Sequence, residues 1–169
     1  MDSTALKELQ SPLKERYRDD AASAVVTMRA SGSLDSGHLA CKVETGRALV
    51  EAGLHPAAGG SGLQACSGDM LLEALVACAG VTLTAVATAL ELPLEGGEVR
   101  AEGDLDFRGT LGVDKTAAVG FREIRLHFDL DCAADDEQIA TLLKLTERFC
   151  VVYQTIAKGP PLRLSHSRI

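Results

Sequence analysis

The chain has 169 residues, of which 46% are hydrophobic and 24% charged, and these values fit a single compact soluble domain. Its net charge of −7 argues against a nucleic-acid partner, because phosphate binding depends on clustered lysine and arginine. Residues 1–20 carry charges of both signs without an apolar core, and the longest apolar run is interrupted by glycine and threonine, so we expect neither a signal peptide nor a membrane span. The expected location is the cytoplasm, where thiols are normally reduced.

The N-terminal segment is predicted to form a short amphipathic helix. Its apolar residues recur near helical spacing at Leu6, Leu9, Leu13 and Tyr17. Pro12 is expected to interrupt the helix, because proline lacks the N–H that a helix interior requires. We expect one face of this helix to pack as an arm across the main domain.

Short strands and turns follow. Residues 24–30 contain neighbouring valine and threonine, residues 31–37 are rich in glycine and serine, and residues 38–44 alternate, which predicts a strand, a turn and a second strand. A tight turn then leads into a third strand at 48–51, which completes a β-meander. The glycine-rich residues 57–62 predict a flexible loop.

A long apolar helix is predicted over residues 70–91 and ends before Pro93. Ser67 is expected to cap its N-terminus, and Asp69 lies in the first turn, where the helix dipole favours negative charge. The residues are small or apolar on every side, so we expect the helix to be central and buried. Small residues such as Gly80 also permit close approach by another helix or chain.

The rest of the chain alternates between strands and helices. Two strands are predicted near residues 95–108 and 118–131, joined by a polar hairpin loop. A helix over residues 135–150 with an acidic first turn is followed by a short helix that starts at 151–156. A closing strand is predicted at 162–167. Helices and antiparallel strands in this order indicate an α+β fold.

The cysteines are the candidates for reactive chemistry: Cys41, Cys66, Cys78, Cys132 and Cys150. Their odd number and unpaired spacing argue against a disulfide scaffold. Cys-x-x-Cys and His-x-x-x-His spacings do not occur in the sequence, which argues against a zinc site. We expect Cys41 and Cys132 to be inert thiols, and the reactivity of Cys66, which precedes the central helix, stays open.

Cys78 and Cys150 both lie in apolar helical segments that are expected to meet in the core. If the two are neighbours, one can attack as a thiolate and the other can resolve its sulfenic acid as a disulfide. An attacking thiol needs a pKa lowered by a nearby cation or by a helix N-terminus. The residue pattern alone leaves two interpretations open, a redox pair or two inert buried thiols.

Two segments around these cysteines resemble the signatures of the OsmC/Ohr family of osmotically inducible and organic hydroperoxide resistance proteins. The glycine-rich loop and residues 67–83, Ser-Gly-Asp-Met-Leu-Leu-Glu-Ala-Leu-Val-Ala-Cys and the turn beyond, are similar to the first signature. Residues 145–156, with Phe-Cys-Val-Val-Tyr at their centre, are similar to the second. The resemblance covers residues 23–169 and leaves residues 1–22 as an N-terminal helical extension.

The resemblance implies an OsmC-like fold, in which antiparallel sheets wrap around long central helices of an intertwined homodimer. It also implies a thiol-dependent peroxidase that reduces organic hydroperoxides or hydrogen peroxide. Cys78 attacks the peroxide and becomes a sulfenic acid, and Cys150 resolves that acid as a disulfide. A dithiol such as a lipoylated protein, or a small thiol, then restores the pair. No metal or organic cofactor is expected.

Two supporting side chains follow from the same resemblance. The carboxylate that polarises the site in the family corresponds to Asp69, which is one methylene shorter than glutamate. The arginine that stabilises the thiolate in the hydroperoxide-resistance branch lies in the first hairpin turn, which contains none here, so Arg47 or else Arg29 is the expected substitute. The chain thus looks closer to the general OsmC-like branch. The alternative functions are non-catalytic binding of a small molecule and redox sensing.

Overall fold

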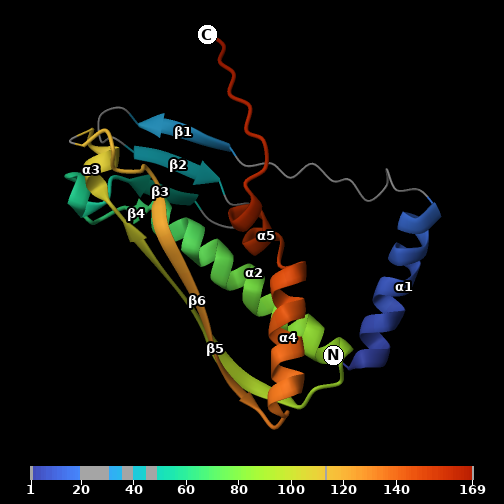
Figure 1. Ribbon diagram of the computed structural model, residues 1–169. Helices are drawn as coiled ribbons and strands as arrows, with labels where there is room; N and C mark the ends of the chain where they lie inside the picture. Colours follow the sequence, from blue (N-terminus) through green and yellow to red (C-terminus); the bar gives the residue numbers. More distant parts are fainter. Residues whose placement is uncertain (1, 20–30, 36–39, 45–48, 113, 169) are drawn as a thin grey trace.

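The computed structural model describes residues 2–19, 31–35, 40–44, 49–112 and 114–168 (Figure 1). The elements are, in chain order, α1 (Ser3–Asp19), β1 (Ser31–Asp35), β2 (Ala40–Glu44), β3 (Leu49–Gly53), the 3-10 helix η2 (Pro56–Ala58), β4 (Ala65–Cys66), α2 (Ser67–Ala89), β5 (Leu94–Leu105), α3 (Phe107–Thr110), β6 (Phe121–Cys132), α4 (Asp136–Phe149) and α5 (Val151–Lys158). Helices and antiparallel strands are both present, which confirms the predicted α+β class.

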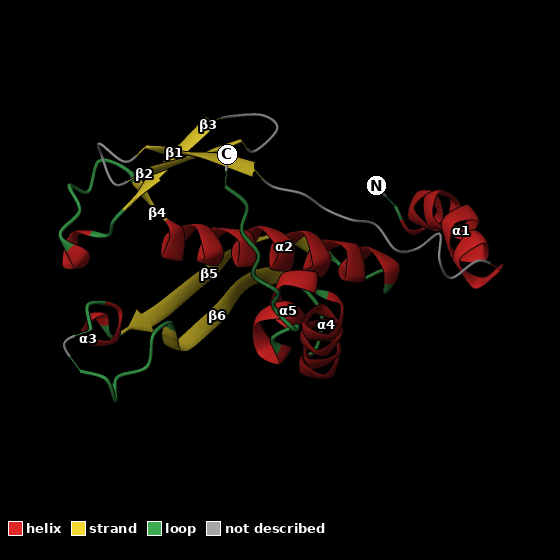
Figure 2. Cartoon of the chain, turned by 90° about the horizontal axis from the view of Figure 1, so that it is seen from above, coloured by secondary structure: helices red, strands yellow, loops and turns green. Residues whose placement is uncertain are grey.

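The long helix α2 lies between two sheets. One sheet has the order β1-β2-β3-β4, with antiparallel pairing up to β3 and a short parallel pair between β3 and β4. The other is the antiparallel ribbon of β5 and β6. Figure 2 shows α2 between the two sheets, with α4 and α5 beside the ribbon. This arrangement is that of sheets around a central helix, as the family resemblance implies.

The core runs along one stripe of α2, and three helical or strand segments meet it. Its buried residues recur every four positions: Leu75, Ala79, Leu83 and Ala87. Leu142 of α4 is fully buried against this stripe, and apolar residues of the β5–β6 ribbon pack on the same cluster. The inward residues of β6 alternate with charged outward ones, as the sequence predicts for a half-buried strand.

The opposite side of α2 is exposed, so the expectation that the helix is buried on every side is wrong for this chain. Val81, for example, is 73% exposed. By length and composition alone, α2 is long and apolar enough to cross a membrane, whereas the sequence predicts no such span because glycine and threonine interrupt the apolar run. Only 28% of the most apolar window of α2 is buried. Its contacts with β5, α4 and α5 make it the core helix of this domain.

Three predicted boundaries are wrong. The N-terminal helix α1 is not interrupted at Pro12 but continues through it to Asp19. The Ser11 hydroxyl, next to this proline, donates a hydrogen bond to the Lys7 carbonyl. Residues 31–35, predicted as a turn, form β1, because pairing with β2 overrides the local turn preference of glycine and serine. The helix α2 begins at Ser67 instead of being capped by it, since pairing of β4 holds the preceding residue in an extended conformation.

The C-terminal segment is also different from its prediction. Residues 162–167 are extended but are not hydrogen-bonded as a strand to any described part of the chain. Leu162 is 93% exposed and Leu164 is fully exposed. Figure 1 shows this segment projecting away from the domain beyond α5. The closing strand predicted at 162–167 is therefore not formed within the described residues.

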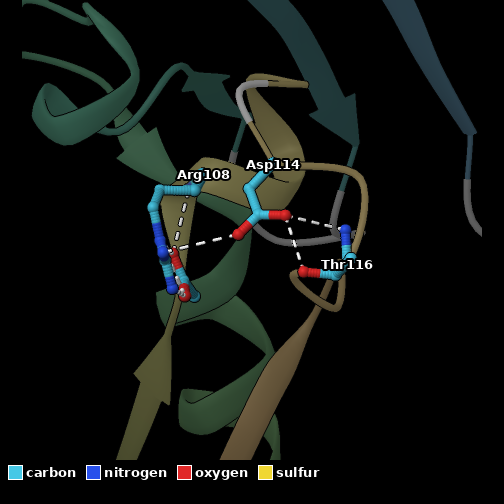
Figure 3. Close-up of polar contacts among 4 residues, drawn as sticks. Arg108, Asp114 and Thr116 are labelled. Carbon is cyan, nitrogen blue, oxygen red and sulfur yellow. Dashed lines mark hydrogen bonds and ion pairs between the residues drawn. The ribbon is translucent and has the colours of Figure 1, made fainter.

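A polar network organises the connection between β5 and β6, where a plain hairpin loop is predicted. The short helix α3 follows Asp106, whose carboxylate accepts the backbone N–H of Arg108 at 3.1 Å and pairs with its guanidinium at 2.6 Å. Figure 3 shows Asp114 between Arg108 and Thr116, and it accepts the Thr116 hydroxyl at 2.7 Å. The hydrogen bond from Arg108 lowers the pKa of Asp106 to about 2.

The candidate thiol site

Cys78 and Cys150 lie next to each other where α2 meets the junction of α4 and α5. Cys78 is half-buried in the middle of α2, and Cys150 is only 1% exposed. Both are free thiols, and each shifts the pKa of the other. The structure therefore brings together the two cysteines that the sequence analysis selected.

The position of Cys150 follows from how α4 ends. Leu142, Thr146 and Cys150 recur every four residues and form the buried stripe of α4 that faces the core. The extended backbone of Cys150 ends α4 and at the same time begins α5. Because Cys150 joins the two helices, the first N–H groups of α5 lie beside the Cys150 and Cys78 thiols.

The N-terminus of α5 supplies backbone donors that lower the pKa of the Cys78 thiol. Burial raises the pKa of the Cys78 thiol, but hydrogen bonds from the Val152 N–H, the Cys150 thiol, the Val151 N–H and the Thr82 hydroxyl together lower that pKa below the value of an ordinary thiol. The first N–H groups of a helix have no partner within the helix and favour a negative charge. Cys78 is therefore a thiol whose thiolate form is stabilised chiefly by backbone amides.

Cys150 has the opposite tendency. Burial raises the pKa of its thiol, the N–H of Tyr153 offsets part of that effect, and the adjacent Cys78 raises it further. When one of the two thiols loses its proton, the first to do so is Cys78, and Cys150 keeps its proton and donates a hydrogen bond. The two cysteines are thus chemically different although they are neighbours.

The other predicted site residues are not part of this cluster. Asp69 is exposed in the first turn of α2, and it precedes Cys78 by two and a half helical turns, which places it on the opposite side of the helix. There it lines a shallow surface groove beside Ala101 of β5. Arg47 and Arg29 both lie outside the described residues.

Sequence reasoning missed the groups that act on the thiolate. It considered a cation or a helix N-terminus in general, but it did not identify Thr82 or the N–H groups of Val151 and Val152. A signal was available, because Cys150 immediately precedes a short helix and Thr82 follows Cys78 by one helical turn.

The remaining described cysteines are separate from the site. Cys66 is half-buried just before α2, and Cys132 is half-buried at the end of β6. In the ranges that the structure describes, no group of three or more histidine, cysteine, aspartate or glutamate side chains could hold a metal ion.

An apolar cavity of about 600 Å³ lies near the thiol pair, although neither Cys78 nor Cys150 is among its described lining residues. It lies between α2, β6 and α5, and its lining includes Leu71, Leu75, Phe121, Tyr153 and Ile156. Leu75 lies about one turn before Cys78 on α2, and Tyr153 is the residue whose N–H faces Cys150. Arg122 and Glu123 add two charged side chains to the lining.

Comparisons with known proteins agree with this architecture. The family described as OsmC-like protein matches residues 60–165. An OsmC-like protein of Mycoplasma pneumoniae is 16% identical with a TM-score of 0.65, and the match covers 79% of this chain and 89% of that one. An organic hydroperoxide resistance protein OsmC of Legionella pneumophila is 18% identical with a TM-score of 0.62, covering 80% and 91%. A comparison with curated protein sequences gives no match.

A third solved structure is similar to the same extent. The organic hydroperoxide resistance protein of Elizabethkingia anophelis is 18% identical, with a TM-score of 0.62 and coverage of 80% and 90%. The family match spans more than half of the chain and includes both cysteines. The chain belongs to the OsmC family. Two of the solved structures similar to it are named as organic hydroperoxide resistance proteins.

Proposed function

We propose that the protein is a thiol-dependent peroxidase that reduces organic hydroperoxides or hydrogen peroxide with Cys78 as nucleophile and Cys150 as resolving residue. The observation that carries the proposal is the contact of Cys78 with both Cys150 and the first N–H groups of α5. A stabilised thiolate beside a second, protonated thiol is what a two-cysteine peroxidase requires.

The proposed reaction has two steps on the protein. The Cys78 thiolate attacks the terminal oxygen of the peroxide, the O–O bond breaks, and the alkoxide takes up a proton and leaves as an alcohol. Cys78 becomes a sulfenic acid. The Cys150 thiol then attacks that sulfur, which forms the disulfide and releases water. External thiols reduce the disulfide, and neither a metal nor an organic cofactor takes part.

The apolar cavity supports an organic peroxide as substrate. Its lining of Leu71, Leu75 and Ile156 suits a hydrocarbon or aromatic group attached to the peroxide. Burying such a group against these side chains is favourable by about 25 cal/mol for each Å² removed from water. Hydrogen peroxide offers no such group, so we expect it to be reduced less efficiently.

The rival functions are non-catalytic binding and redox sensing, and one experiment separates them from the enzyme. Consumption of cumene hydroperoxide with a dithiol reductant is measured for wild type, Cys78→Ser and the control Cys66→Ser. We expect wild type and the control to consume peroxide equally and Cys78→Ser to lose that activity. Equal, slow consumption by all three proteins would show that the chain is not a peroxidase and would favour a binding role.

A sensor differs from an enzyme in its turnover. In wild type, mass spectrometry after one equivalent of peroxide should show a disulfide between Cys78 and Cys150. A protein that forms this disulfide but completes only one cycle in the presence of excess dithiol is a sensor. Two thiols that stay free after peroxide would exclude the two-cysteine mechanism.

A homodimer is proposed as the working form. The open side of α2 and the extended C-terminal segment leave apolar side chains in water, among them Val81, Leu162 and Leu164. A second copy of the chain would cover the helix and could pair with the segment as a strand. Sedimentation of wild type and of a Leu162→Glu, Leu164→Glu variant tests this, because we expect a dimer that the variant weakens. A monomeric wild type would contradict it.

A further inference from the structure

The junction of α4 and α5 ends one helical hydrogen-bond pattern and begins another. The N–H of Cys150 donates to the Thr146 carbonyl at 2.9 Å, which closes α4. In a continuous helix the next hydrogen bond would run from the Val151 N–H to the Glu147 carbonyl. The extended backbone of Cys150, with ψ at 109°, separates these two groups, so neither has a partner within its own helix.

Each of the two groups finds a partner elsewhere. The Val151 N–H, together with that of Val152, faces the Cys78 thiol and lowers its pKa. The Glu147 carbonyl accepts a hydrogen bond at 2.9 Å from the side-chain amide of Gln154. The Gln154 side chain therefore occupies the carbonyl that the Val151 N–H would take in a continuous helix.

Gln154 belongs to α5 and reaches back to α4. Its backbone N–H donates to the Cys150 carbonyl at 3.0 Å, at the start of α5, while its side chain bonds in the last turn of α4. The helix α5 has only eight residues, none of them is buried, and Cys150 gives its N-terminus no side-chain cap. A helix this short depends on contacts with the rest of the chain. The bond from Gln154 is one that fixes α5 relative to α4.

Resting on the proposed function, we propose that Gln154 is a positioning residue for the nucleophile Cys78. By holding the Glu147 carbonyl, its amide keeps the first N–H groups of α5 from continuing the hydrogen-bond pattern of α4. These N–H groups stay at the thiol. Gln154 thus acts on the sulfur through the backbone of Val151 and Val152.

Loss of the amide has a defined structural consequence. The Glu147 carbonyl then needs another donor, because an unpaired backbone carbonyl is unfavourable where water is partly excluded. Rotation of the Cys150 backbone from extended to helical supplies the Val151 N–H as that donor. The same rotation removes this N–H from Cys78.

The test follows the reactivity of Cys78 without peroxide. Alkylation by iodoacetamide is measured as a function of pH by peptide mapping of the full chain, with Cys150→Ser as the parent so that one thiol of the pair is followed. Gln154→Met keeps the length of the side chain and removes its donor. The control Gln64→Met makes the same replacement at a glutamine that donates to Glu51 at 2.6 Å beside β3.

We expect Gln154→Met to be alkylated roughly two- to fivefold more slowly than the parent at neutral pH, with its midpoint at higher pH. Gln64→Met should match the parent. At high pH Gln154→Met should not be slower than the parent, because the thiolate is then fully formed in both. This convergence separates a positioning role from a structural one, since a general loosening of α5 would alter access to the thiol at every pH.

A second variant restores a donor at the same position. Gln154→Lys carries an ammonium group that donates hydrogen bonds, so it should keep the pH profile of the parent. A nearby cation also lowers the pKa of a thiol by itself. The matched control is therefore Gln154→Met combined with Thr155→Lys, which places the same charge at the neighbouring exposed residue and should remain slow.

One measurement needs the parent alone. The backbone amide NMR signals of Val151 and Val152 should shift with pH at the midpoint of Cys78 alkylation. Amide signals that do not follow the thiol would overturn the inference, even where a variant fails to fold. An unchanged pH profile in Gln154→Met, or full restoration by Thr155→Lys, would overturn it as well.

The outcome for Gln154 is separate from the outcome for peroxide reduction. A chain in which the profile of Cys78 depends on Gln154 but which consumes no peroxide would overturn the proposed function only. A chain that reduces peroxide and whose Cys78 profile is unchanged in Gln154→Met would overturn the positioning role only.

Discussion

Thr82 lies one helical turn after Cys78 on the same face of α2, and its hydroxyl helps to lower the pKa of the Cys78 thiol. Threonine in a helix usually returns its hydroxyl to a backbone carbonyl, as Thr84 does to Gly80 at 3.0 Å. The Thr82 hydroxyl, in contrast, acts on the Cys78 thiol by lowering its pKa. The helix that carries the proposed nucleophile therefore also carries one of the groups that stabilise its thiolate.

Replacing Thr82 with valine should make Cys78 less reactive at neutral pH. Valine has nearly the same shape but cannot donate, so the pKa of Cys78 should rise and less thiolate should be present. We expect alkylation by iodoacetamide at pH 7 to slow roughly two- to fivefold, which corresponds to the loss of one modest hydrogen bond. The control is Thr84→Val on the same helix. Equal rates in all three proteins would show that the hydroxyl does not act on the thiol.

The two roles of Cys150 can be separated by two substitutions. Cys150→Ser keeps a donor beside Cys78 but cannot form a disulfide, whereas Cys150→Ala removes the donor as well. Both variants should accumulate a sulfenic acid on Cys78 after peroxide, detected by dimedone labelling and mass spectrometry. The alanine variant should react more slowly, because its Cys78 loses a hydrogen bond that lowers the pKa. Dimedone labelling of wild type as strong as that of the variants would contradict a resolving role.

The pH dependence of the site follows from the direction of the shift. The thiolate is the nucleophile, and the hydrogen bonds that outweigh burial hold the pKa of Cys78 below that of a free thiol. Alkylation of Cys78 should therefore rise with pH and level off at a lower pH than alkylation of a model thiol such as N-acetylcysteine. The measurement uses Cys150→Ser, so that a single cysteine of the pair is followed. A midpoint above that of the model thiol would contradict the assigned activation by α5.

The core is expected to depend on Leu142 far more than on its neighbour in the sequence. Leu142 is fully buried between α4 and α2, whereas Leu143 is 37% exposed. Leu142→Ala should lower the free energy of unfolding by about 2 to 5 kcal/mol through lost burial and the cavity that remains. Leu143→Ala should cost about 1 kcal/mol or less. Urea denaturation of the two variants checks this, and similar midpoints would contradict the packing of α4.

The polar network after β5 should contribute stability in a defined pH range. The pKa of Asp106 in the folded protein is lowered to about 2 from an ordinary 3.8 by its hydrogen bonds with Arg108. A lowered carboxyl pKa stabilises the fold above the ordinary value, and that contribution is lost as the pH falls toward 2. The difference in Tm between wild type and Asp106→Asn should therefore shrink between pH 5 and pH 2.5. Glu95→Gln, an exposed carboxyl on β5, is the control.

The sequence predicts the elements that carry a strong local pattern. The alternation of β6 and the acidic first turn of α4 are reproduced by the structure within a few residues. β1 is different, because serine and glycine favour a turn locally and only pairing with β2 makes residues 31–35 a strand. The burial of α2 could not be read from its composition either, because an apolar side chain is equally compatible with the core and with a surface that a second chain covers.

The proximity of the two thiols could be predicted from the sequence, whereas the groups that surround them could not. Two cysteines in family signatures point to Cys78 and Cys150, and the structure places them in contact. The groups that surround a thiol depend on how the helices pack against one another, and this tertiary packing cannot be read from a local sequence pattern. Asp69 shows the same point, since it is close to Cys78 in sequence but on the other side of the helix. Backbone N–H groups carry no residue-type signal, so the contribution of α5 cannot be recognised by searching for charged side chains.

The donors at the start of α5 also bear on the redox equilibrium of the pair. They stabilise the thiolate form of Cys78 in the reduced protein, and they have no anion to bind once that sulfur is in a disulfide. Stabilising the reduced form raises the reduction potential of a dithiol couple, so a disulfide between Cys78 and Cys150 should be a relatively strong oxidant. The same two residues at the start of α5, Val151 and Val152, would then favour both the proposed attack on peroxide and the reduction of the disulfide by mild thiols.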